Sequence, residues 1–530
     1  MVGFKERSPM KVQLAWGLVV AFACAGTSSH PQETGPLPPD ASTAEATTDT
    51  ASAVTWGPLS RGYKVMRGIV HLHSLYSHDG CYDGKDRPAE DSPYMLQCLA
   101  ELRAAPCQSG VDFAFQTDHP ANLRDHTFEE ALHYSPSDGD ELVKDEKGRV
   151  LANRVKCPEG SLVPHYLFFV GTEGKKQMPI GLSDPIAPEI FDTSYGDDTP
   201  LDKAQTAIAK VHEAGGFAFA AHTEETNISA ERIVALPLDG MEIFNVHAMF
   251  IALLGDLFDF AATLDTFMAE GPLADLVLLP KLAPVAADVE KFDRVAPKVR
   301  IAIVAATDIH RNVELPLDPP PCKDGFEDGG MCENMHAAYP NFSKVLRDGG
   351  PFILNDGERL DSYRRSFRWF ANYALVPTAG EAQAVREAVG KGRAFSAFDM
   401  FGVPQDFDFF AIADGKTVEM GEEVHGAKEI TLYVRPPRPG RPPWWAGPEI
   451  DWSSAKVVTR VIHATEGGSM AVAEFGGVES SLELSKVEPG AWRVEVSVTP
   501  VHLKPALKGV EASADVERPY LYSNAIFVRP

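Results

Sequence analysis

The stretch Gly68-Ile69-Val70-His71-Leu72-His73-Ser74-Leu75-Tyr76-Ser77-His78-Asp79-Gly80 decides the fold that we predict for this chain. Its apolar start predicts a buried strand, and His71 and His73 then point to one face because side chains alternate along a strand. His78 and Asp79 follow within a few residues. Grouped imidazole and carboxylate side chains are typical ligands of Zn, Mn or Fe. The segment therefore predicts part of a metal site at a strand end.

Four further segments repeat this layout of a short apolar run that ends in possible metal ligands. They are Val111–Gln116 before Thr117-Asp118-His119, Leu167–Val170 before Gly171-Thr172-Glu173, Phe217–Ala221 before His222, and Ile301–Ala306 before Thr307-Asp308-Ile309-His310. Apolar runs separated by helix-like stretches are typical of a parallel sheet that is buried on both faces. In barrels built from such strands, the chemistry collects at the carboxyl ends of the strands. The sequence thus predicts an α/β fold with one site at that edge.

The order of the motifs HxHSxxSH, TDH, GTE, AH and TDxH resembles the PHP family, named for polymerase and histidinol phosphatase. Gly215-Gly216-Phe217, Gly240–Asn245 and Gly392-Arg393-Ala394-Phe395 look closest to its carbaryl-hydrolase-like branch. The resemblance covers about residues 66–400. It implies a distorted (β/α)7 barrel that holds two or three divalent ions (Zn, Mn or Fe) and hydrolyses phosphoesters.

The resemblance also implies a set of ligands for each ion. The first ion would be held by His71, His73, Glu173 and Asp308; the second by Glu173 as a bridge and His222; and the third by His78, His119 and His310. Spacing alone leaves His78 and Asp79 open as alternatives at the third ion. The family usually has another His shortly after the bridging Glu, which this chain lacks. Two alternatives follow: His247 substitutes for it, or the second site is under-liganded and weak or empty.

The predicted reaction is phosphoester hydrolysis by a hydroxide that bridges the ions near Glu173, because bound divalent ions activate water at neutral pH. The residues predicted to carry it are Glu173, Asp308, His222 and His119. Lys175, Lys176 or Arg311 is expected to neutralise phosphate oxygens. Two alternatives remain: the same site hydrolyses carboxylic or carbamic esters, or the chain is a non-catalytic surface binding protein that retains the fold.

Composition and the chain start indicate an exported protein that does not bind nucleic acid. The chain of 530 residues has 75 acidic and 49 basic residues and a net charge of −26, which opposes binding to phosphate backbones. A small molecule or a surface polymer is the expected ester substrate. Residues 1–24 are typical of an export signal. Ala21-Phe22-Ala23-Cys24 resembles a lipobox, so Cys24 is a candidate lipid anchor at the outer membrane, with plain cleavage and a periplasmic or cell-surface location as the alternative.

The remaining regions complete the predicted organisation. Residues 25–58 are rich in Ser, Thr and Pro and are expected to form a disordered tether. The barrel domain is predicted over residues 59–400, and a β-sandwich-like domain over 401–530, where polar and apolar residues alternate between Gly- and Pro-rich turns. The six cysteines after Cys24 predict disulfides, with Cys322–Cys332 as the first expected pair and Cys98–Cys107 as the second.

Overall fold

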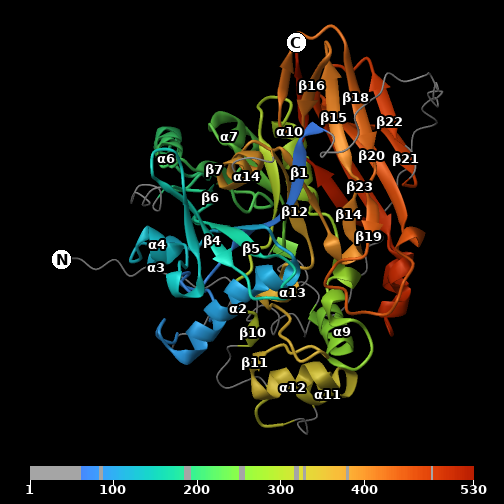
Figure 1. Ribbon diagram of the computed structural model, residues 1–530. Coiled ribbons are helices and arrows are strands. Elements are labelled where there is room, and N and C mark those ends of the chain that lie inside the picture. Colours follow the sequence, from blue (N-terminus) through green and yellow to red (C-terminus); the bar gives the residue numbers. More distant parts are fainter. Residues whose placement is uncertain are drawn as a thin grey trace. The chain divides into compact units, whose positions relative to one another are not determined.

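The computed structural model describes residues 61–82, 87–183, 193–246, 248–249, 257–315, 322–325, 330–377, 381–478 and 481–530. The predicted export signal with Cys24, the predicted tether and His247 lie outside these residues. The described part is a mixed α/β structure with one large sheet, covering helices and a C-terminal region rich in strands (Figure 1). None of its helices combines the length and the apolar character needed to cross a membrane.

The first three predicted strands lie side by side and run parallel. They are β1 (Tyr63–Leu72), β2 (Phe113–Gln116) and β5 (His165–Phe169). Ala114 of β2 pairs with Ile69 on one side and with Phe168 on the other. Every residue of β2 is buried, as predicted for a strand covered on both faces. Helix α2 (Pro93–Ser109) connects β1 to β2 and begins at the capping residue Ser92.

A second sheet holds the other predicted strands. It is formed by β6 (Gln177–Ile180), β7 (Phe217–Ala220), β8 (Gly240–Asn245) and β9 (Ala302–Ala306), and the last three run parallel. Connecting or covering helices are α6 (Leu201–Glu213), α7 (Ala230–Ala235), α9 (Leu257–Met268) and α10 (Ala286–Val295). The prediction of buried parallel strands is therefore confirmed in both sheets.

Hydrogen bonds at two seams connect these sheets. Between β1 and β9, Leu72 and Ile309 form a parallel bridge, and the Asp308 amide donates to the His71 carbonyl at 2.6 Å. Between β5 and β6, the Leu182 amide donates to the Val170 carbonyl at 2.9 Å. Apolar side chains from both sheets, including Phe169, pack into one core. The seams bring the carboxyl ends of β1, β2, β5, β7 and β9 together.

The large sheet continues without a break into the C-terminal region. Beyond β1 come β12 (Ala371–Pro377) and β13 (Ala394–Ala397), joined by α14 (Glu381–Gly390), and β24 (Arg518–Ser523) pairs with β13. The other neighbour of β24 is β23 (Gly490–Thr499), which also pairs with β20 (Lys456–Thr465) and β25 (Ile526–Arg529). Strand β21 (Gly468–Gly476) pairs with β20, and β17 (Glu423–His425) pairs with β25. A separate sheet contains β15 (Asp408–Ala413), β16 (Lys416–Glu419), β18 (Ile430–Arg435) and β22 (Leu482–Ser485). Residues 61–530 belong to one compact unit, and a domain boundary at 400/401 stays a prediction.

Smaller elements border this framework. Residues 135–160 form the hairpin β3 (Glu141–Lys144) and β4 (Val150–Lys156), which extends the large sheet beside β5, an addition that we did not predict. The other short elements are α3 (Pro120–Leu123), α4 (Phe128–Ala131), α11 (Met331–Ala338), α12 (Pro340–Asp348), α13 (Tyr363–Ser366), β10 (Glu314–Leu315), β11 (Gly350–Pro351), β14 (Val403–Gln405) and β19 (Arg438–Gly440).

Three disulfides connect Cys81 to Cys98, Cys107 to Cys157 and Cys322 to Cys332. The predicted Cys322–Cys332 pair is confirmed, and the predicted Cys98–Cys107 pair is wrong. Cys98 and Cys107 lie on the same helix, α2, where nine residues of rise separate them by ~13 Å, whereas bonded cysteines need Cα atoms within ~7 Å. Disulfides are typical of exported proteins.

Candidate metal centre

Unusual backbone conformations mark three of the strand ends. His71, His222 and Asp308 adopt positive φ angles of 64°, 50° and 47°, in the left-handed region that few residues other than glycine occupy. Each such residue costs about 1–3 kcal/mol, which the surrounding contacts have to offset. This backbone conformation occurs at the point where three predicted ligands leave their strands, and it helps to turn them toward one another.

The central group of side chains forms around Asp308. Its Oδ1 atom lies 3.1 Å from His71 Nε2 and 3.2 Å from His73 Nε2, and its Oδ2 atom lies 3.6 Å from His222 Nε2. Glu173 approaches from the end of β5, with Oε1 3.6 Å from His222 Nε2. The structure thus brings together the five residues predicted for the first two ions.

A second group lies next to the first. It consists of His73, Asp79, His119 and His310, whose candidate ligand atoms all lie within 4.8 Å of one another. The Nε2 atoms of His119 and His310 each lie 3.5 Å from a carboxylate oxygen of Asp79. The rings of His73 and His310 are stacked, with their centroids 3.8 Å apart. His73 and Glu173 connect the two groups, because Glu173 Oε2 is also 2.8 Å from His119 Nδ1.

His78 lies outside these groups. Its side chain is 57% exposed, and its Nδ1 atom is 3.7 Å from Asp79 Oδ1. Of the two alternatives that spacing left open, the structure therefore places Asp79 among the other candidate ligands. The ligand roles of all these residues stay predictions.

The buried polar atoms at the centre fit a shared cation better than a hydrogen-bond network. Among the described residues, His71 Nε2, His73 Nε2 and Glu173 Oε2 are buried and have no hydrogen-bond partner, although oxygens or nitrogens lie near them. Such orphaned atoms are costly in a protein interior. Two ligands bonded to one ion at about 2.1 Å and at ordinary coordination angles lie ~3.0–3.4 Å apart. The separations of the two imidazoles from Asp308 match this range.

Two further carboxylates, Glu242 and Glu224, lie next to the Nδ1 atoms of His71 and His222. Glu242 is fully buried on β8, and its Oε1 atom accepts a hydrogen bond from His71 Nδ1 at 2.5 Å. Its Oε2 atom accepts from the His222 amide at 2.7 Å and from Asn245 Nδ2 at 3.1 Å. Glu224 Oε1 lies 3.4 Å from His222 Nδ1. A carboxylate at Nδ1 leaves Nε2 as the atom that can bind a metal. We did not predict the role of Glu242. A single carboxylate within an apolar, buried strand could have indicated it, because a buried charge needs a partner.

The two central carboxylates are held in their anionic forms. Burial by itself would raise the pKa of Asp308 and of Glu173, but the surrounding imidazoles outweigh this effect and hold both values well below the usual range. Burial and the neighbouring His310 lower the pKa of His73. Anionic carboxylates and neutral imidazoles are the forms that bind metals. Despite burial, neighbouring carboxylates raise the pKa of His71, His119 and His222, so these three imidazoles would release a proton when a metal binds.

Other residues near the site have different partners from those that we expected. Asp118 accepts two hydrogen bonds from Ser74 at 2.5 Å, and burial raises its pKa to about 7. Lys176 is paired with Glu225 at 2.5 Å. Arg311 is paired with Glu101 at 2.6 Å, so its proposed contact with phosphate remains a prediction.

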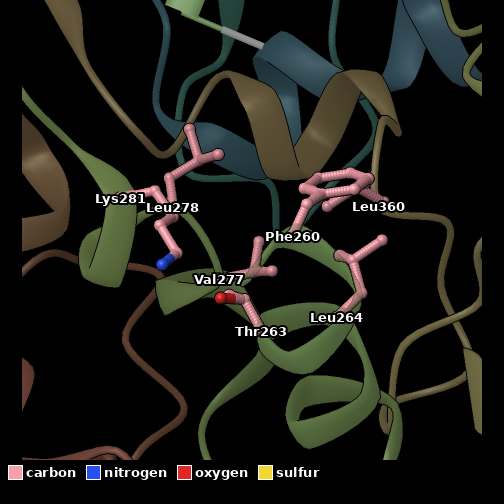
Figure 2. A pocket seen from close by; sticks show the side chains of 7 residues that line it. All are labelled: Phe260, Thr263, Leu264, Val277, Leu278, Lys281 and Leu360. Atoms are coloured by element: carbon pink, nitrogen blue, oxygen red, sulfur yellow. The ribbon is translucent and has the colours of Figure 1, made fainter. Parts of the chain in front are cut away.

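An apolar hollow of the surface lies apart from these groups. Figure 2 shows its lining: Phe260, Thr263, Leu264, Val277, Leu278, Lys281 and Leu360. None of these residues belongs to the candidate ligand groups. Most come from α9 and the segment after it, so the hollow reflects the packing of this helix.

Comparison with known proteins gives weak structural matches. No family model and no curated protein matches the chain. A similar solved structure is the crystal structure of a two-domain protein from Bacteroides vulgatus ATCC 8482, described as containing a predicted PHP-like metal-dependent phosphoesterase. The similarity covers 86% of this chain and 95% of that chain, at 12% sequence identity and a TM-score of 0.30. Because this likeness is low, the function of the chain has to be inferred from the side chains of the candidate metal centre.

Proposed function

We propose that this chain is an exported metal-dependent hydrolase of the PHP type, acting as a phosphoesterase. The observation that carries the proposal is the convergence of His71, His73, Glu173, His222 and Asp308 from four strand ends into one buried cluster. The arrangement of parallel strands, joined at two seams, supports the distorted (β/α)7 barrel implied by the sequence motifs. The three disulfides support export.

Each residue of the cluster has a defined task in this proposal. Divalent ions bound here would supply an activated water molecule and positive charge beside the phosphate oxygens. Glu173 and Asp308 provide the anionic oxygens, and His71, His73 and His222 present Nε2 toward them. Glu242 keeps a proton on His71 Nδ1 and thereby fixes the orientation of that ring.

The expected substrate is a phosphate ester of a small molecule or a surface polymer. The net charge of −26 repels anions at long range, so the attraction has to come from the site itself. A lipid anchor at Cys24 would place the enzyme at the cell surface and is part of the proposal. Nucleic acid is not an expected substrate.

Elemental analysis of the purified protein and a substrate panel test this function. We expect two or three Zn, Mn or Fe ions per chain and faster hydrolysis of p-nitrophenyl phosphate or its diester than of p-nitrophenyl acetate. The double change His71→Ala and His73→Ala should abolish turnover, whereas His165→Ala, a partly exposed control, should retain it. Faster acetate hydrolysis would identify an acyl ester hydrolase. At most one ion per chain without turnover would indicate a binding protein.

A further inference from the structure

Asp308 and His310 of the candidate metal centre come shortly after strand β9. One edge of β9 is fully paired with a neighbouring strand, whereas the other edge is paired only in part. One edge pairs with β8 along its length. On the other edge, the residues that follow β9 bond to β1, through the Thr307 and Asp308 amides. Within the described residues, β9 is the last strand of its sheet, so the first half of this edge has no backbone ladder.

Two asparagine side chains replace the missing ladder. Asn524 Oδ1 accepts from the Ile303 amide at 2.7 Å, and Asn524 Nδ2 donates to the Ile303 carbonyl at 3.0 Å. Asn372, on β12, makes the same pair of bonds with Ala305, at 2.9 and 2.8 Å. The amide of an asparagine side chain has a C=O acceptor and N–H donors, as a peptide group does. Each of the two side chains therefore replaces the pair of hydrogen bonds that one residue of a neighbouring strand would make.

Asn524 belongs to the C-terminal region and is itself held firmly. It directly follows β24, and its Nδ2 atom also donates to the Ala394 carbonyl at 2.9 Å. Its side chain is completely buried, where an unpaired amide would be costly. Through these bonds the C-terminal region holds β9 at Ile303, five residues before Asp308.

We propose that Asn524 is a positioning residue for the metal centre, through which the C-terminal region sets the placement of β9 and hence of Asp308 and His310. This inference rests on the proposed metal-dependent function. It assigns the C-terminal region a part in building the metal centre. Loss of the Asn524 bonds lets β9 shift, and small displacements of a ligand weaken its bond to a metal.

The test uses the full-length protein and Co²⁺ as the probe. Asn524→Asp keeps the size of the side chain and the acceptor for Ile303, but it removes the donors to the Ile303 and Ala394 carbonyls. We expect about tenfold weaker Co²⁺ binding in a chelator competition, a changed visible absorption spectrum of the bound Co²⁺, and faster hydrogen exchange at Ile303. Val461→Ala, a buried truncation on β20 in the same C-terminal region, is the matched control for lost stability and should keep the Co²⁺ affinity and spectrum of the wild type.

Each outcome decides the question. Wild-type affinity and spectrum in Asn524→Asp would overturn the positioning role while leaving the proposed function intact. An equal loss of affinity in Val461→Ala would also overturn it, since general destabilisation would then explain the effect. A wild-type protein that binds no Co²⁺ would overturn both proposals. If Asn524→Asp does not fold, Asn524→Ala removes all three side-chain bonds without adding a buried carboxyl group and is judged by the same three measurements.

Discussion

Replacing Glu242 by glutamine tests the organisation of the metal centre without changing a predicted ligand. The side chain keeps its size and loses its charge. Glu242 accepts hydrogen bonds on both oxygens, from His71 Nδ1 at 2.5 Å and from the His222 amide at 2.7 Å. Glutamine has only one oxygen, so one of these donors must face an NH2 group. One of the two histidines then loses the partner that orients it.

The expected loss is 10- to 100-fold in metal affinity, the usual effect of removing an outer partner of a metal ligand, which corresponds to about 1.4–2.7 kcal/mol. The assay titrates the metal-free protein with Zn²⁺ against a chromophoric chelator. Asp293→Asn is the control, because it breaks a buried ion pair with Arg493 at 2.9 Å that involves none of the candidate ligands. The control should lower the unfolding temperature and keep the metal affinity. A Glu242→Gln affinity within about twofold of wild type, in a folded protein, would refute the reasoning.

Three further predictions follow from other described contacts. Asp79→Asn should bind one ion fewer per chain in elemental analysis, whereas His78→Gln should bind as many as wild type; the reverse result would return His78 to the site. The double change Cys107→Ser and Cys157→Ser opens a loop of 50 residues and should cost about 4 kcal/mol of unfolding free energy in urea, with no loss expected if these cysteines are unpaired. Burial, with Arg103 nearby, lowers the pKa of His133 to about 3, below the 6.5 of an unfolded chain. The unfolded state therefore binds the proton first, and stability falls as the pH drops below 6.5; this imidazole alone accounts for about 2 kcal/mol lost between pH 7.5 and 5. His133→Gln should show a correspondingly smaller loss in urea titrations, and an unchanged pH dependence would contradict the assigned pKa.

Local patterns in the sequence were sufficient for the strands and for most candidate ligands. The apolar runs before His71, His119 and Asp308 predicted buried parallel strands, because a strand covered on both faces needs apolar residues on both. Parallel strands end at one edge, so the sequence also predicted which side chains meet.

Choices between neighbours and contacts between distant segments required the tertiary structure. His78 and Asp79 are adjacent in the sequence, and only the path of the loop turns Asp79 toward His119 and His310. The bond of Glu242 to His71 spans 171 residues, and that of Asn524 to Ile303 spans 221. The sequence around such a residue does not reveal its hydrogen-bond partner, because a buried polar group bonds to whichever segment packs against it. The sequence by itself determined the candidate ligands and the strands that carry them, and packing decided which side chains hold these candidates in place.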